Sequence, residues 1–380
     1  MIPYGRQFID EEDIEAVVEV LKSDFITQGP KVKEFEDKLA RYCGAKYCVV
    51  FNSGTSALLG AYYACGISEG DEVITSPITF VATTNMILVL RAKPVFVDVE
   101  PDTGNINSEL IEGAITDKTK AIVPVHYAGH PVDMEKIRSV ADRYGLRVIE
   151  DACHALGAEY KGSKVGSCEH SDAAVFSFHP VKHITTGEGG AVLTNDEDIY
   201  QKLLLIRNHG INREKFMYEP DGDWYYEVQA LGFNFRLTDI QASLGISQLK
   251  KLDRFVRRRR EIANYYANEL GENPFFDLPV EKPYTLHSYH LYPVRLKDIY
   301  ADIKREIVKK LREEGIGVQV HYIPVYRHPL YRELGYHNLL LPNAENFYKR
   351  VFTLPIYPSM KEEELKLVVG ACKDAEVFGV

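Results

Sequence analysis

The first half of the chain alternates short apolar runs with stretches of helical periodicity. The apolar runs are rich in β-branched residues and lack polar alternation, which is typical of strands buried on both faces of a sheet. One helical stretch follows Asp133, a good N-cap residue, and stops at Gly145. Strands separated by helices predict a largely parallel sheet with helices on both faces. The apolar runs lie at residues 47–52, 72–75, 95–99, 121–126, 147–151, 173–178 and 190–195.

The pattern changes after about residue 250, where helices and strands mix in a more charged chain. This predicts a small α+β domain at 251–380 behind a large domain at 1–250. The run Arg257–Arg260 is expected to be a solvated helix face rather than an anion site. The expected elements of the small domain are a helix at 252–270, a strand at 290–296, a helix at 303–314, a strand at 317–322 and a helix at 361–373.

Composition narrows the classes of function. A net charge of −10 argues against nucleic-acid binding, which usually needs a basic excess. The six cysteines show no CxxC pair, so we expect reduced, mostly buried thiols and no metal site. The first residues do not resemble a signal peptide, and no run approaches the roughly 20 apolar residues of a membrane span. We therefore expect a soluble, cytoplasmic protein that does not bind membranes.

Two side chains with reactive chemistry follow buried strands. Lys182 lies in a Gly- and Thr-rich loop between two apolar runs, where a lysine can lose its proton and form an imine with a carbonyl compound. Asp151 ends an apolar run, and the carboxyl end of a parallel strand points into the usual ligand crevice. Taken alone, Lys182 reads as a surface residue and Asp151 as a helix N-cap. Their spacing, with one buried strand between them, favours a shared site.

Other candidates surround this pair. Ser53, Gly54 and Thr55 open a helix directly after a strand, so free backbone N–H groups there can hold a phosphate, although simple helix capping explains the same residues. Phe80 follows another strand and can stack on a flat ring or belong to the core. We expect two further contacts near a bound group, one from His154 and one from Ser177, which lies five residues before Lys182.

Five motifs in order resemble those of the DegT-type sugar-nucleotide aminotransferases, over nearly the whole chain. They are NSGTSAL, SPITFVATTN, EDACHALGAEY, FSFHPVKHITTGEGG and LGFNFRLTDIQASLG. The resemblance implies an aspartate-aminotransferase-like α/β fold (fold-type I) with a mostly parallel seven-stranded sheet. It also implies pyridoxal 5′-phosphate as cofactor and a homodimer with shared active sites.

The resemblance implies a role for each matching residue. Lys182 would bond the cofactor and shuttle protons, Asp151 would hold the ring nitrogen, and Phe80 would cover the ring. Gly54, Thr55 and Ser177 would contact the phosphate, and Asn234 would reach the phosphate in the neighbouring subunit. His154 stands where several relatives carry Gln and would contact the cofactor. The substrate side would be lined by Tyr4, Asp24, Phe25, Ile26, Thr27, His321, Tyr322, Ile323 and Pro324.

Four segments also resemble the members of the family that act in the pseudaminic-acid pathway: IPYGRQFIDEEDIEAV, FITQG, HPVKHITTGEGG and VQVHYIPVY. These members transfer an amino group from L-glutamate to C4 of a UDP-linked 2-acetamido-2,6-dideoxy-4-keto-hexose, giving UDP-4-amino-4,6-dideoxy-N-acetyl-β-L-altrosamine. A dehydratase branch replaces the lysine with histidine, so Lys182 favours amino transfer. The alternatives are another UDP- or dTDP-linked keto-sugar, another fold-type I reaction such as desulfuration, or a pyridoxal-phosphate-binding regulator without turnover.

Overall fold

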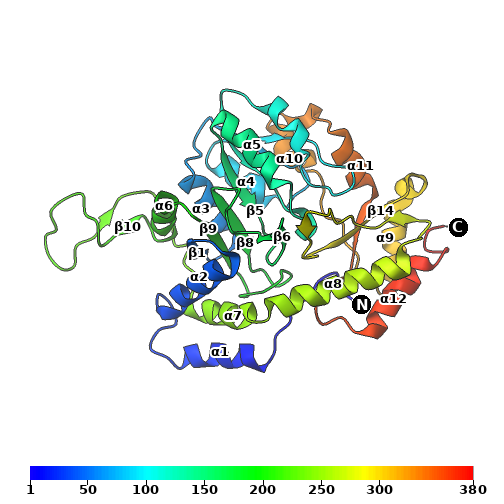
Figure 1. Cartoon of the computed structure of the whole chain (residues 1–380), viewed down its shortest axis with the longest axis horizontal. Helices are drawn as coiled ribbons and strands as arrows, with labels where there is room; N and C mark the ends of the chain where they lie inside the picture. The colour runs from blue at the N-terminus through cyan, green and yellow to red at the C-terminus, as the bar shows by residue number, and fades with distance from the viewer. Residues whose placement is uncertain (380) are drawn as a thin grey trace.

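A seven-stranded sheet forms the centre of the molecule (Figure 1). The computed structural model describes residues 1–379. The strand order is β1-β9-β8-β5-β4-β2-β3, and only β9 runs antiparallel to its neighbours. All seven predicted strands are present, and the mostly parallel sheet is confirmed. They are β1 (Tyr47–Phe51), β2 (Glu72–Thr75), β3 (Lys93–Phe96), β4 (Thr119–Val123), β5 (Arg147–Asp151), β8 (Ala173–Ser177) and β9 (Gly190–Thr194).

The bounds of β3 and β4 differ from the prediction, and the antiparallel direction of β9 follows from the short loop before it. β3 starts and ends earlier than 95–99, and β4 ends at Val123 rather than 126, because Pro124 has no N–H for the ladder. Residues 178–189 contain no helix, so the chain cannot cross over after β8 and returns antiparallel as β9. This return keeps the loop that carries Lys182 at the carboxyl end of β8.

Helices cover both faces of the sheet. In β1, Val49 and Phe51 pack against α3 and α6, whereas Cys48 and Val50 pack against α2 and α7. This period of two buries both faces, as the unbroken apolar runs predicted. The helices of this part are α1 (Glu11–Leu21), α2 (Pro30–Cys43), α3 (Gly54–Ala64), α4 (Ala82–Val89), α5 (Met134–Tyr144), α6 (Glu197–Arg207) and α7 (Asp239–Leu249).

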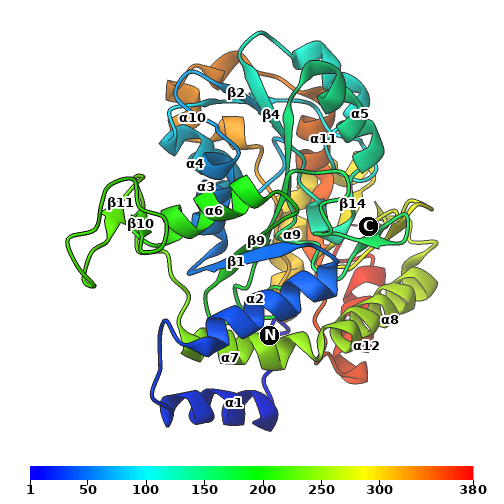
Figure 2. The same ribbon diagram turned by 60° about the vertical axis from the view of Figure 1, so that its left-hand side comes forward.

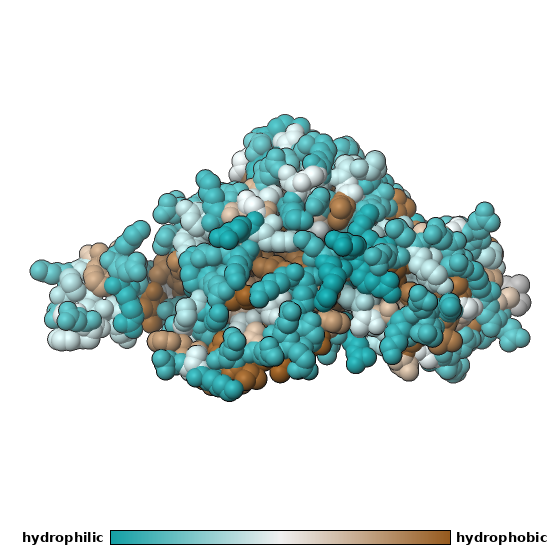
Figure 3. Space-filling view, turned by 60° about the horizontal axis from the view of Figure 1, so that its bottom comes forward, coloured by the Kyte–Doolittle hydropathy of each residue, from teal (hydrophilic) through white to brown (hydrophobic). Residues whose placement is uncertain are grey.

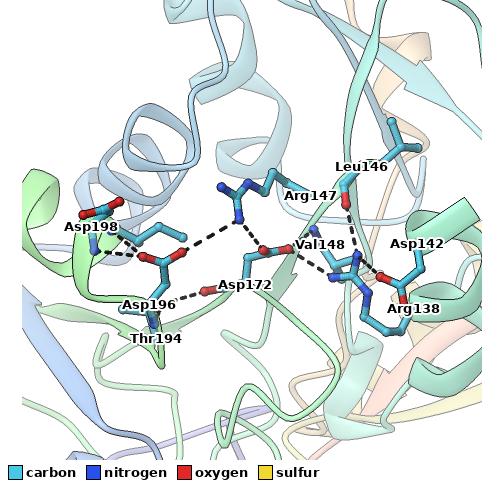
Figure 4. Close-up of polar contacts among 10 residues, drawn as sticks. Arg138, Asp142, Leu146, Arg147, Val148, Asp172, Thr194, Asp196 and Asp198 are labelled. Atoms are coloured by element: carbon cyan, nitrogen blue, oxygen red, sulfur yellow. Dashed lines mark hydrogen bonds and ion pairs between the residues drawn. The ribbon is translucent and has the colours of Figure 1, made fainter. Parts of the chain in front are cut away.

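Asp172 ties the amino ends of β5 and β8 together (Figure 4). Its carboxylate accepts from Arg147 Nη1 at 2.6 Å, Arg138 Nη1 at 3.1 Å and the Val148 N–H at 2.8 Å. The register set here pairs Asp151 with Val175, so Asp151 and Ser177 both lie at the opposite, carboxyl edge of these strands. By contrast, the carboxylate of Asp133 at the start of α5 accepts from the Tyr160 hydroxyl at 2.7 Å and makes no cap bond to the helix.

The C-terminal part has its own apolar core and a three-stranded sheet of order β12-β14-β15. The strand predicted at 317–322 is wrong: Gln319 makes only an isolated bridge to Thr353, and the Gly317 N–H bonds to Ile2 instead. The boundary at 250/251 stays a prediction. The elements are α8 (Leu252–Leu270), β12 (Phe276–Asp277), β14 (Tyr292–Leu296), α9 (Lys304–Glu313), α10 (Pro329–Glu333), α11 (Pro342–Arg350), β15 (Val351–Leu354) and α12 (Glu362–Lys373).

The arginine run on α8 is not uniformly solvated. Arg257 is exposed, but Arg259 is fully buried, with 0% of its surface accessible. The prediction for the run is therefore wrong at this position. Position 259 falls on the apolar face of α8, four residues after Phe255 and three before Ile262, so helical periodicity turns it inward.

A hairpin arm projects from the sheet beyond α6 (Figures 1 and 2). It is formed by β10 (Ile211–Asn212) and β11 (Glu227–Val228), whose two-stranded pairing is separate from the large sheet. A further small sheet joins β13 (Thr285–Leu286) to β6 (Glu159–Tyr160) and β7 (Ser163–Lys164).

The six cysteines are free thiols, as expected. Within residues 1–379, every helix is too short or too polar to cross a membrane.

Candidate active site

A cavity of about 460 Å³ opens at the carboxyl ends of β5 and β8. This volume lies within the roughly 300–1,000 Å³ of small-molecule sites. Many of the predicted residues meet here although they come from distant segments. Those that line the cavity are Tyr4, Gly54, Thr55, Phe80, Asp151, His154, Ser177, Lys182, His321 and Tyr322.

The first turn of α3 forms one wall. Ser53 caps the helix: its hydroxyl accepts the Ser56 N–H at 3.1 Å, and the Ser56 hydroxyl accepts the Ser53 N–H at 3.1 Å. This leaves the N–H groups of Gly54 and Thr55 for an anion, with the positive end of the helix dipole behind them. A Cβ added to Gly54 would lie 2.8 Å from Ser177 Cβ, so only glycine lets the turn approach Ser177 this closely. Capping and anion binding coexist here.

Asp151 lies at the floor of the cavity and is 5% exposed. Its Oδ2 accepts from Thr83 Oγ1 at 2.6 Å and its Oδ1 from the Cys153 N–H at 3.2 Å. These two donors fix the plane of the carboxylate. The Asp151 side chain bonds forward only to the loop residue Cys153 and lines the cavity, so it does not act as a helix N-cap.

Lys182 is half-buried, and its amine points toward histidine side chains. Nζ lies 3.5 Å from His290 Nε2. Burial lowers the pKa of the Lys182 amine, and the nearby Cys153 and Asp151 oppose this shift. A larger fraction of the amine is therefore uncharged near neutral pH than for a lysine in water.

His154 and Tyr322 form a polar wall across the cavity. The Ala128 N–H donates to His154 Nδ1 at 3.3 Å, so the proton of the neutral ring sits on Nε2, which lies 3.1 Å from the Tyr322 hydroxyl. Burial, and then the charge of Lys182, holds the pKa of His154 well below its usual value. Burial likewise raises the pKa of Tyr322. His154 is therefore a neutral donor here.

Phe80 stands at the cavity mouth with 57% of its surface exposed, which excludes the alternative of a core residue.

Several predicted residues lie outside this cavity. Asn234 is exposed, and its carbonyl accepts from Asn52 Nδ2 at 3.4 Å. The residues of the exposed loop before α2 and those after Tyr322 also lie outside it: Asp24, Phe25, Ile26, Thr27, Ile323 and Pro324.

The sequence reasoning missed several residues of the site. Thr83 donates to Asp151, Thr79 bonds the hydroxyl of Thr83, and His290 reaches Lys182. The segment SPITFVATTN contains both threonines, so the motif itself was a signal for them. His290 had no such signal, because it lies 108 residues from Lys182 in the chain.

The family model of the DegT/DnrJ/EryC1/StrS aminotransferases matches residues 7–373. The chain is 42% identical over 371 residues to UDP-4-amino-4,6-dideoxy-N-acetyl-beta-L-altrosamine transaminase of Campylobacter jejuni, covering 97% of this chain and 96% of that protein. It is also 42% identical over 377 residues to the spore coat polysaccharide biosynthesis protein SpsC of Bacillus subtilis, covering 98% and 96%.

Solved structures agree with this placement. PseC of Helicobacter pylori, an aminotransferase involved in the biosynthesis of pseudoaminic acid, superposes with a TM-score of 0.93 at 39% identity, covering 100% of this chain and 99% of that one. The putative sugar aminotransferase Spr1654 of Streptococcus pneumoniae, in its PMP form, has a TM-score of 0.93 at 31% identity with the same coverage.

A buried carboxylate and a half-buried lysine at the sheet edge of this fold, together with these relatives, define a pyridoxal-phosphate-dependent aminotransferase. The substrates of this class are small molecules. More narrowly, the chain belongs to the DegT/DnrJ/EryC1/StrS family and is a sugar aminotransferase.

The residues fit the cofactor chemically. The glycine-lined helix start offers two N–H groups and the Ser177 hydroxyl to a phosphate, and a Cβ at Gly54 would close that cradle. Asp151 retains lone pairs for a ring N–H beside its two protein donors. Lys182 provides the amine and Phe80 a flat wall.

Proposed function

We propose that this enzyme transfers an amino group from L-glutamate to C4 of a UDP-linked 2-acetamido-2,6-dideoxy-4-keto-hexose. The product would be UDP-4-amino-4,6-dideoxy-N-acetyl-β-L-altrosamine, a step of pseudaminic-acid biosynthesis. The similarity to the Campylobacter and Helicobacter proteins supports this choice. The observation that carries the reaction type is the presence of the Lys182 amine and the Asp151 carboxylate in one cavity.

In this proposal the first turn of α3 and Ser177 bind the phosphate, Asp151 holds the ring nitrogen and Phe80 covers the ring. Bound pyridoxal phosphate supplies a carbonyl carbon that bonds amines and a ring that accepts an electron pair. Lys182 would hold that carbon through its Nζ in the resting enzyme. With an amino donor bound, the uncharged Nζ would serve as the base for the proton on the donor's α-carbon and then as the general acid that returns it. The lowered pKa of Lys182 supports the base role.

The substrate side of the cavity is assigned to Tyr4, His154, His321 and Tyr322. His154 and Tyr322 present neutral hydrogen-bonding groups at the cavity wall, as suits an uncharged sugar. Burial lowers the pKa of His321 to about 4, so it is neutral too. The proposal extends the nucleotide side to the exposed segments Asp24–Thr27 and Ile323–Pro324.

The proposal includes a homodimer in which each subunit completes its partner's site. Brown side chains gather where the arm joins the body in Figure 3. Large apolar side chains are exposed on and beside the arm, including Met217 at 73%, Trp224 at 74% and Leu231 at 74%. Such exposure is typical of an interface. Asn234 follows directly and is assigned to the partner's phosphate.

Mixing variants tests the shared site. Lys182→Ala and Asn234→Ala homodimers should each be weak, and mixed dimers should regain activity because one of their two sites carries both native residues. A monomer in sedimentation, or no regain of activity after subunit exchange, would count against a shared site.

The free cysteines are compatible with a cytoplasmic location, which we include in the proposal.

Two experiments test the reaction. Borohydride should fix the cofactor to Lys182 of the wild-type protein, whereas Lys182→Ala should lose both this bond and turnover. Mass spectrometry of products from UDP- and dTDP-linked keto-sugars, with glutamate as donor, tests the acceptor. Amination of a different sugar would favour the second candidate, a transaminase for another polysaccharide precursor, which the Bacillus relative supports at equal identity.

A further inference from the structure

His290 occupies a position directly beside the reactive lysine. Its Nε2 lies 3.5 Å from Lys182 Nζ, at the outer limit of a hydrogen bond. The side chain is 4% exposed, and its ring lies 4.4 Å from that of His154, centre to centre. His290 does not line the open cavity, so it meets Lys182 from the buried side.

The backbone that carries His290 is held in place by a buried cation. Arg259 Nη1 donates to the carbonyls of Tyr289 at 3.1 Å, His290 at 3.3 Å and Ile356 at 2.9 Å. Tyr289 has a φ of 49°, a left-handed conformation that non-glycine residues adopt only where surrounding contacts impose it. These contacts fix the backbone from which the His290 side chain extends toward Lys182.

His290 is uncharged at neutral pH. Burial is the main cause that holds its pKa well below the usual value, and the positive charges of Lys182 and Arg259 act in the same direction. A neutral imidazole carries one proton, on either Nδ1 or Nε2.

The surroundings of the ring decide which nitrogen carries that proton. His290 Nδ1 is buried and finds no hydrogen-bond partner in residues 1–379. A proton on Nδ1 would therefore be a buried donor without an acceptor, which folded proteins avoid. A proton on Nε2 faces the lone pair of the Lys182 amine instead. His154 carries its proton on the same atom, because Ala128 occupies its Nδ1.

We propose that His290 is a positioning residue whose Nε2–H donates to the uncharged Lys182 amine and holds it ready to bond the cofactor. This inference rests on the proposed role of Lys182. A donor to the lone pair stabilises the uncharged amine, and the bond is given up when Nζ reacts. Two other groups act on the charge of Lys182: Asp151 at the end of β5 and Cys153 just after it both favour the charged amine. Besides burial, the charge of Lys182 in turn lowers the pKa values of the nearby His154, His183 and His321.

The test measures cofactor attachment rather than turnover. Cofactor-free protein is mixed with pyridoxal phosphate, and the rate of bond formation to Lys182 is followed by absorbance across pH. His290→Leu removes the donor, whereas His290→Gln keeps an N–H group at similar reach. His130→Leu is the matched control, because His130 is 2% exposed and contacts Asn105 and Pro131 rather than the site.

We expect the attachment rate of His290→Leu at neutral pH to fall about two- to tenfold, the effect of one lost hydrogen bond. The rate should recover at high pH, so the midpoint of the profile moves upward, while His290→Gln and His130→Leu stay close to wild type. An unchanged profile in His290→Leu, or a midpoint that moves downward, overturns the proposal. Absence of attachment in the wild type would instead refute the role of Lys182 itself.

A second measurement does not depend on how the leucine variant folds. The nitrogen resonances of isotope-labelled histidine in the cofactor-free protein report which ring nitrogen carries the proton, and the signal missing from His290→Gln identifies His290. A proton on Nε2 supports the proposal. A proton on Nδ1, or a charged ring at neutral pH, overturns it.

Discussion

The hydroxyl of Thr83 provides a sharp test of how the buried carboxylate is held. Thr83 Oγ1 donates to Asp151 Oδ2 at 2.6 Å, and the two residues are 1% and 5% exposed. Thr83→Val keeps nearly the same shape but removes the donor. The carboxylate then keeps only the Cys153 N–H, at 3.2 Å. A hydrogen bond to a charged group contributes about 1.5–3 kcal/mol, so cofactor-free Thr83→Val should lose about that much unfolding free energy.

Thr79→Val is the matched control. Thr79 is 3% exposed and bonds Thr83 at 2.8 Å between two neutral hydroxyls, a contact that contributes about 0.5–1.5 kcal/mol. Urea unfolding of the cofactor-free proteins measures both losses. Bound pyridoxal phosphate, whose ring nitrogen is proposed to donate to Asp151, should shrink the penalty of Thr83→Val more than that of Thr79→Val. Equal losses in the two variants, with and without cofactor, would refute this account of Asp151.

Two further predictions concern stability away from the cavity. Asp172→Ala removes the acceptor of Arg138, Arg147 and Val148 (Figure 4), and the free energy of unfolding measured in urea should fall by about 1–3 kcal/mol. Asp142→Ala breaks a single ion pair with Arg138 and should lower it by at most about 1 kcal/mol. Equal losses in the two variants would contradict the role of Asp172. Burial lowers the folded-state pKa of His130 to about 4, so between pH 6.5 and 4 the unfolded chain binds a proton that the folded one does not. The unfolding free energy should therefore fall by about 1.4 kcal/mol per pH unit across this window because of His130. In His130→Leu the plot of unfolding free energy against pH should be shallower by this amount. Identical slopes in the two proteins would rule out His130 as the cause.

Local pattern determined much of the fold. The seven apolar runs predicted the strands of the large sheet, because strands buried on both faces need unbroken apolar sequence. The α8 and α12 helices also follow from periodicity and end near the predicted residues. The errors lie where a distant partner decides. The segment 317–322 reads as a strand, but the N-terminal residue Ile2 and Thr353 take its hydrogen bonds.

The residues of the candidate site also divide into those that the sequence could locate and those that depend on tertiary packing. Asp151, Ser177 and the first turn of α3 could be located from the sequence, because each lies at the end of a strand or just after one, and the carboxyl ends of parallel strands meet at one edge. The sequence also placed Phe80 near these residues, but it could not decide whether the Phe80 side chain belongs to the core or to the cavity wall. Its exposure depends on packing that no local pattern encodes.

The order of strands and helices, the strand-end positions of the reactive residues and the family motifs were all present in the amino-acid sequence. Tertiary structure alone decided the contacts of Lys182 and Asp151. Thr83 reaches Asp151 across 68 residues of chain and His290 reaches Lys182 across 108. It also decided that Arg259 is buried within a run of arginines. Hydrophobic periodicity records which face of an element turns inward, whereas the partner found there depends on how separate elements pack.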